Sequence, residues 1–150
     1  MKASIVLRRM SALLSALVLA LLLGCEAHRT AEHDPQVAET ILEVADAVDA
    51  FWQEMASSPE DERAYREFAP GWADIESELA SLLLRQEIRP LNEHAVEQTE
   101  IALELWQELR EQHADEDEFS DFEAERSRDQ FRRIFIAMAR GEQARVVEDP

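Results

Sequence analysis

Histidine flanked by acidic residues is the pattern in this chain that comes nearest to a metal-binding motif. His94 follows Glu93 directly and precedes Glu97 by three positions. Paired-metal sites inside helical bundles use Glu-x-x-His, with the glutamate first, and repeat the motif on a second helix. Here the order is reversed and His113 has no equivalent partner. We therefore expect no metal site, and we interpret both histidines as solvated or helix-flanking, since neither lies among strongly apolar neighbours.

A dense acidic run that begins at Asp115 is the second candidate site, with seven acids in eleven residues. Laid on the calcium-loop template, its sixth position is Ser120 instead of glycine and its twelfth is Arg126 instead of glutamate, which rules out an EF-hand. The run is most simply a solvated loop and the acidic first turn of a helix. The sharper hypothesis is partner binding by Phe119 and Phe122, because aromatic residues among acids suit a basic, apolar groove.

Sequence motifs of the common enzyme classes are absent. The chain has no Gly-rich phosphate loop, no Ser-x-x-Lys nucleophile motif and no Cys-x-x-Cys-His haem attachment. A noncovalent haem would need inward-facing ligands from two helices, for which Met55 or Met138 with His94 or His113 is the conceivable set. Carboxylates are so numerous that any acid–base pair would be an arbitrary choice. We expect a non-enzyme with no catalytic residue and no cofactor.

The first 25 residues have the three-part organisation of an export signal. Three basic residues and no acid come first, and residues 12–23 are then apolar apart from Ser15. This run is shorter than the roughly 20 residues that a membrane-spanning helix needs, so a cleaved segment is favoured over an uncleaved anchor. It ends in Leu22-Leu23-Gly24-Cys25, which resembles the lipobox of bacterial lipoproteins.

This resemblance implies that Cys25 carries a diacylglyceryl group, that residues 1–24 are removed, and that the protein is anchored in the bacterial cell envelope. Cys25 is the single cysteine of the chain and has no partner for an internal disulfide. Two acyl chains meet the requirement for stable attachment. Glu26 follows the cysteine where an aspartate would favour the inner membrane, so we expect the outer membrane, with the domain facing the periplasm.

Charge excludes one class of partner. All 33 acidic residues and 12 of the 15 basic residues follow Cys25, which gives the chain after the signal a formal charge of −21. Such a surface repels phosphate groups, so we expect no nucleic acid partner.

Proline punctuation and apolar spacing predict four amphipathic helices behind a polar tether at 25–33. The second is expected to be kinked or broken near Pro70-Gly71, and the fourth to end with Gly141 as a left-handed cap. The four predicted helices are 35–56 with Asp34 as its cap, 58–89, 90–113 and 120–141.

Apolar residues recur at spacings of three and four in each segment. The third helix is expected to bury Leu91, Ala95, Gln98, Ile101, Ala102, Leu105 and Leu109, and the fourth to bury Phe122, Phe131, Ile134, Phe135 and Met138. The three tryptophans, at 52, 72 and 106, are expected in the core.

The predicted fold is all-α, an antiparallel four-helix bundle over residues 34–141, followed by a frayed tail at 142–150. The expected function is that of a lipid-anchored, noncatalytic envelope protein that binds another envelope protein as adaptor or as assembly or stability factor. The alternative is a periplasmic helical bundle that binds a ligand or a metal.

Replacing Cys25 by Ala tests the anchor. The variant should leave the membrane fraction and lose incorporation of labelled palmitate, because the thiol that accepts the lipid is gone. Retention in the membrane with unchanged labelling would contradict the lipoprotein interpretation.

Overall fold

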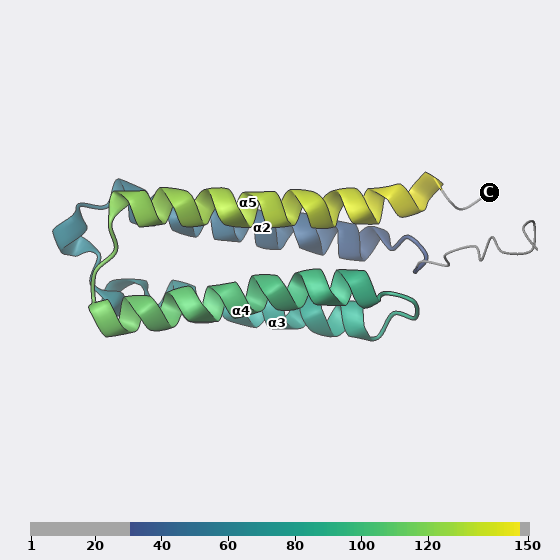
Figure 1. Ribbon diagram of the computed structural model, residues 1–150, viewed down its shortest axis with the longest axis horizontal. Coiled ribbons are helices and arrows are strands. Elements are labelled where there is room, and N and C mark those ends of the chain that lie inside the picture. Colours follow the sequence, from purple (N-terminus) through teal and green to yellow (C-terminus); the bar gives the residue numbers. More distant parts are fainter. Residues whose placement is uncertain (1–30, 148–150) are drawn as a thin grey trace, which may run out of the picture.

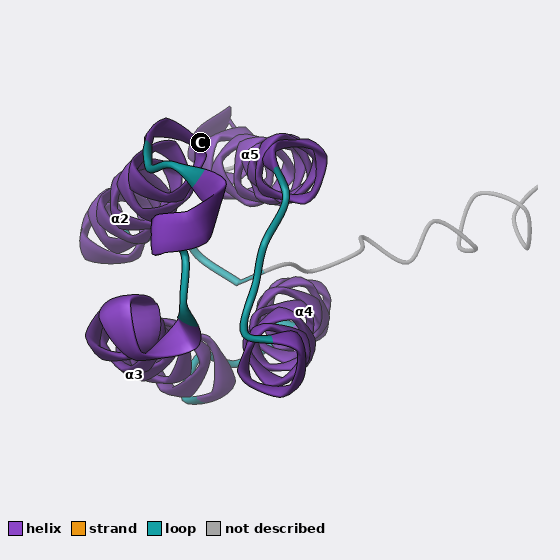
Figure 2. Cartoon of the chain, turned by 90° about the vertical axis from the view of Figure 1, so that its left-hand side faces the viewer, coloured by secondary structure: helices purple, strands orange, loops and turns teal. Residues whose placement is uncertain are grey.

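The computed structural model describes residues 31–147 as an antiparallel four-helix bundle, in agreement with the predicted fold (Figure 1). Viewed along its axis, the helices occupy the corners of a square, with α2 beside α5 and α3 beside α4 (Figure 2). Cys25 and the predicted export signal lie outside the described residues. Within those residues, no helix is both long and apolar enough to cross a membrane. The elements are α2 (Pro35–Ser57), η1 (Glu60–Glu62), α3 (Tyr65–Glu87), α4 (Glu93–Glu116), α5 (Asp121–Ala144) and η2 (Arg145–Val147).

Helix α2 begins where its capping residues predict. The Asp34 carboxylate accepts hydrogen bonds from the amides of Gln36 at 2.9 Å and Val37 at 3.4 Å, and Pro35 occupies the first helical position. The predicted stripe is buried and consists of Val37, Ile41, Val44, Val48, Phe51, Trp52 and Met55.

The second predicted helix is interrupted, but earlier than expected. After the single turn of η1 the chain breaks at Arg63 and Ala64, and α3 then runs without interruption through Pro70. Because α3 begins at Tyr65, Pro70 lies in its second turn, where the missing N–H costs one intrahelical bond. The predicted start at Ser58 was therefore wrong, and of the two outcomes predicted at Pro70-Gly71, a kink or a break, the break does not occur.

Arg63 explains the position of the break. Its buried guanidinium donates to the carbonyl oxygens of Ser58 and Phe119, each at 2.9 Å, and to a carboxylate oxygen of Asp121 at 2.5 Å. These bonds join the α2–α3 connection to the α4–α5 connection. A buried arginine in a loop has no periodicity, so the sequence analysis did not identify it.

Helix α4 buries only part of the predicted stripe: Ala102 is fully buried and Leu105 and Leu109 pack against the core, but the centre of the buried face is shifted. Its buried residues are Thr99, Ala102, Trp106 and His113, while Leu91 and Ile101 are each 49% exposed. The inward direction is set by the large Trp106, and residues seven positions before and after it share its face. Thr99 and His113 therefore lie in the core, although both are polar.

Helix α5 starts as predicted and ends later. Ser120 and Glu123 form a reciprocal capping box, in which each side chain bonds the other residue's backbone amide. Gly141 is helical rather than a left-handed cap, and Glu142 is buried in the last turn. At the other end Ala31 is also buried. The predicted boundaries at 33/34 and 141/142 therefore exclude residues that belong to the domain.

Aromatic side chains fill the centre of the bundle, and all three tryptophans are fully buried there, as predicted. The ring of Phe51 lies 4.7 Å from that of Trp72 and 5.0 Å from that of Trp106, in edge-on arrangements. Trp106 donates its indole N–H to the carbonyl oxygen of Trp72 at 2.9 Å, which joins α4 to α3.

Gly71 permits this close contact between α2 and α3. A Cβ at this position would lie 2.9 Å from Cδ2 of Phe51, whose ring is held by its aromatic neighbours. Gly141 is also helical, but a Cβ there would meet nothing within 4 Å.

The two glycines make a matched pair of variants. Gly141→Ala should stabilise the domain by about 0.5–1 kcal/mol, the helix-propensity difference between the residues. Gly71→Ala should destabilise it by about 1–3 kcal/mol, since overpacking outweighs propensity. Urea unfolding followed by tryptophan fluorescence measures both, and a stabilising Gly71→Ala would contradict the tight contact with Phe51.

Candidate functional site

A groove between α2 and α5 hollows the described surface, with a volume of about 430 Å³. Its floor is apolar, and two of the residues that line it, Ala45 on α2 and Ala139 on α5, have short side chains that leave space open. At its edges Leu42 and Ile136 are exposed, at 57% and 40%. The residues that line the groove are Leu42, Ala45, Asp46, Val48, Asp49, Arg128, Phe131, Arg132, Phe135, Ile136 and Ala139.

The two rims of the groove carry opposite charges. Asp46 and Asp49 lie on α2, whereas Arg128 and Arg132 lie on α5. Arg128 donates two hydrogen bonds to the Asp49 carboxylate, at 2.6 Å and 2.7 Å. These bonds lower the pKa of Asp49 and raise that of Arg128, so both stay charged near neutral pH. Asp46 and Arg132 remain available to orient a bound polar group.

The two phenylalanines predicted to bind a partner differ in burial. Phe119 is buried against Trp52 and His113, with ring centroids 5.5 Å and 5.3 Å away, so its prediction as a docking residue was wrong. Phe122, in the first turn of α5, is 70% exposed. The acidic pattern could not distinguish them, because only the α4–α5 connection decides which ring turns inward.

The two histidines weighed as metal ligands lie in opposite environments. His94 is 86% exposed and lies 3.9 Å from Glu97. No group of three or more potential ligands is close enough to hold a metal ion among residues 31–147. His113 is fully buried in the aromatic core, which contradicts the prediction of a solvated or flanking side chain.

Both ring nitrogens of His113 are hydrogen-bonded. Nδ1 accepts from the indole N–H of Trp72 at 3.0 Å, and Nε2 lies 2.7 Å from the carbonyl oxygen of Arg63, to which it donates. These partners suit the neutral ring with its proton on Nε2. Burial lowers the pKa of His113, although the Arg63 carbonyl and the charge of Asp117 act in the opposite direction. His113 is therefore a core residue that must stay uncharged.

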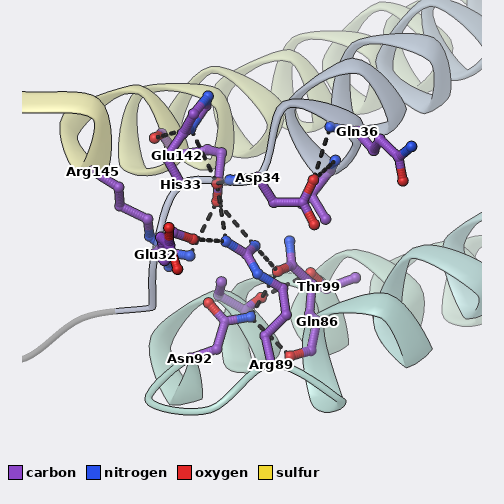
Figure 3. A network of polar contacts seen from close by, with 12 residues as sticks. Glu32, His33, Asp34, Gln36, Gln86, Arg89, Asn92, Thr99, Glu142 and Arg145 are labelled. Atoms are coloured by element: carbon purple, nitrogen blue, oxygen red, sulfur yellow. Dashed lines mark hydrogen bonds and ion pairs between the residues drawn. The ribbon is translucent and has the colours of Figure 1, made fainter. Parts of the chain in front are cut away.

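A polar network closes the end of the bundle where the chain enters α2 (Figure 3). Glu142 is 3% exposed and receives two hydrogen bonds from Arg89, at 3.0 Å and 3.1 Å. It also accepts the backbone amide of Asp34 at 2.8 Å. Arg89 donates further to the carbonyl oxygen of Glu32 at 2.5 Å. The network ties the N-terminal segment to the ends of α3 and α5.

The charges of this network keep Glu142 ionised. Burial alone would raise its pKa, but the hydrogen bonds from Arg89 and from the Asp34 amide, with the positive charge of Arg145, outweigh burial and lower it. Gln86 and Asn92 complete the network through a side-chain bond of 2.7 Å. Apolar spacing does not reveal these polar residues, and the partner of Glu142, Arg89, lies 53 residues away.

Comparison with known proteins adds no functional assignment, because no protein family, curated protein or solved structure matches the chain.

Because the buried His113 must stay uncharged, the stability of the domain should depend on pH. As the pH falls from 7 towards 5, an ordinary histidine with a pKa of about 6.5 takes up a proton in the unfolded chain, whereas His113 in the folded protein resists. The unfolded state then binds more protons, so the free energy of unfolding should decrease across this range. The lowered pKa values of Glu142 and Asp49 act only at lower pH.

Urea unfolding at several pH values measures this loss. His113→Gln, which can still accept from Trp72 and donate to Arg63, should show a flatter pH dependence, whereas the exposed-site control His94→Gln should behave like the wild type. Equal slopes for all three proteins would contradict the role assigned to His113.

Proposed function

We propose that this protein is a lipid-anchored, noncatalytic adaptor of the bacterial cell envelope, and that it holds an amphipathic helix of another envelope protein in the α2–α5 groove. The observation that carries the proposal is the groove itself, an apolar floor between an acidic and a basic rim. Amphipathic helices bind such grooves through apolar anchors at i, i+3, i+4 and i+7, while flanking charges set their direction.

Two features favour binding over catalysis. The aromatic core occupies the interior of the bundle, which leaves the surface for recognition. Three of the described residues whose pKa values are shifted have structural partners: His113 is buried between Trp72 and Arg63, Asp49 pairs with Arg128, and Glu142 pairs with Arg89. These groups are engaged in holding the helices together.

A small apolar ligand is the second candidate. The volume of about 430 Å³ falls within the range of about 300–1,000 Å³ that is typical of small-molecule sites. We prefer a helix because the hollow is bounded by two parallel rows of side chains on long helices and carries charges along both sides. A metal ligand receives no support from the described residues.

Filling the groove tests the proposal. Ala139→Leu places a larger side chain at its floor, whereas Ala137→Leu adds the same side chain at an exposed position two residues away on α5. The full-length lipoprotein is crosslinked in its native membranes and recovered, and co-recovered proteins are compared among wild type and both variants. Recovery of the specific partner should fall about tenfold with Ala139→Leu, a loss of about 1.4 kcal/mol, and stay at the wild-type level with Ala137→Leu.

Two other results would contradict the proposal. A partner lost with neither variant would place binding outside the groove. No partner in any sample, together with a small molecule that co-purifies with wild type and not with Ala139→Leu, would replace the adaptor by a ligand carrier. Unchanged urea midpoints for both variants confirm that binding, not folding, is being compared.

A further inference from the structure

Exposed apolar side chains gather at one end of the bundle. Of the eight large hydrophobic residues exposed in the described chain, four lie at the end where the chain enters α2 and leaves α5, shown at the right of Figure 1. Ile88, which follows the last residue of α3, is the most exposed of them at 75%. The four residues are Leu84, Ile88, Leu91 and Val146, and we call them the apolar end.

Leu91 has no structural reason to be a leucine. Its φ of 59° places it in the left-handed region, where glycine or asparagine is preferred, and its side chain is 49% exposed. Neither backbone conformation nor burial in the domain therefore favours leucine here. A contact outside the described chain would account for it.

The path of the N-terminal segment shows what lies nearest to the apolar end. The amide of the buried Ala31 donates to the carbonyl oxygen of Leu91 at 2.9 Å, so residue 31 is fixed beside this end. Five residues separate Ala31 from Cys25. Even a fully extended chain would span no more than about 20 Å between them. A lipid on Cys25 thus keeps the apolar end within that distance of the bilayer.

The two ends of the bundle also differ in charge, and this difference favours the apolar end as the end that faces the membrane. At the far end, ranges 57–66 and 113–123 contain nine acidic residues and two arginines. At the apolar end, ranges 31–36, 85–94 and 140–146 contain five acidic residues and four arginines. An anionic lipid surface repels the far end and tolerates the nearly balanced apolar end.

We propose that the apolar end rests on the phospholipid surface to which Cys25 is attached, so that the bundle stands on the membrane with its acidic end outward. This inference rests on the lipid anchor of the proposed function. A few apolar side chains bind a bilayer weakly by themselves, but a short tether supplies a high effective concentration and makes their contact persistent. Helices of 24 residues, about 36 Å long, then hold the far end well away from the headgroups.

Fluorescence quenching by headgroup-labelled lipids tests the orientation. The full-length lipoprotein, whose single natural cysteine is occupied by lipid, receives a new cysteine for a fluorophore at the exposed Glu87 or, as a far-end control, at the exposed Asp61. Each protein is reconstituted in phosphatidylethanolamine–phosphatidylglycerol vesicles that contain a nitroxide headgroup lipid. Quenching at Glu87→Cys should exceed quenching at Asp61→Cys several-fold.

A second variant separates contact from mere proximity. In the Glu87→Cys protein, the pair Ile88→Asn and Leu91→Asn removes two apolar side chains, and asparagine suits the left-handed backbone at Leu91. Quenching at Glu87→Cys should then fall markedly, while vesicle flotation still shows the protein bound through its lipid.

Three outcomes would overturn the inference. Equal quenching at the two labels, or stronger quenching at Asp61→Cys, would show that the bundle does not stand on this end. Unchanged quenching after the asparagine substitutions would show that the apolar side chains do not contact lipid. Failure of the wild type to float with vesicles would overturn the anchor itself, and with it both the proposed location and this orientation.

Discussion

The aromatic cluster at the centre of the bundle is the constraint on which the remaining structure depends. Phe51 on α2 meets Trp72 on α3 and Trp106 on α4, and Trp52 extends the cluster towards Phe131 on α5. Large, rigid rings fix both the separation and the rotation of the helices they join. The inward face of α4, the absence of a Cβ at Gly71 and the burial of His113 all follow from where these rings lie.

Polar contacts complete this core at the two ends of the bundle. Arg63 joins the two connections at the acidic end, and Arg89 with Glu142 joins the N-terminal segment to α3 and α5 at the other. The buried Arg63 guanidinium donates to the Phe119 carbonyl and the Asp121 carboxylate, and the buried Glu142 carboxylate accepts from Arg89 and from the Asp34 amide. These bonds connect both ends of the bundle across its helices.

In the proposed function, recognition takes place on the surface of the bundle. The core supports a groove on one side, whose openness depends on small residues at Ala45 and Ala139, and leaves apolar side chains exposed at the end nearest Cys25. In the proposed arrangement the groove would run upright from the membrane, accessible to a helix of a neighbouring envelope protein. The acidic end would limit approach by other anionic surfaces.

The sequence by itself determined the helical class, the bundle, the buried stripe of α2, its capping residue Asp34, the start of α5 near Ser120, and the burial of the three tryptophans. These features follow from local spacing and from side chains that bond within a few residues, so they are visible without tertiary contacts. The start of α3 escaped this reasoning because Arg63 forms its bonds across the bundle to Phe119 and Asp121.

Only the tertiary structure decided the inward face of α4, the environment of His113, the separation of Phe119 from Phe122, and the ends of the domain at Ala31 and Glu142. It also created the α2–α5 groove, since a hollow depends on which small residues face one another. Each outcome depends on partners distant in sequence, whereas periodicity reports only the order of residues along one helix. Polar residues such as His113 and Glu142 are buried because distant donors and acceptors satisfy them, and the linear sequence does not specify those partners.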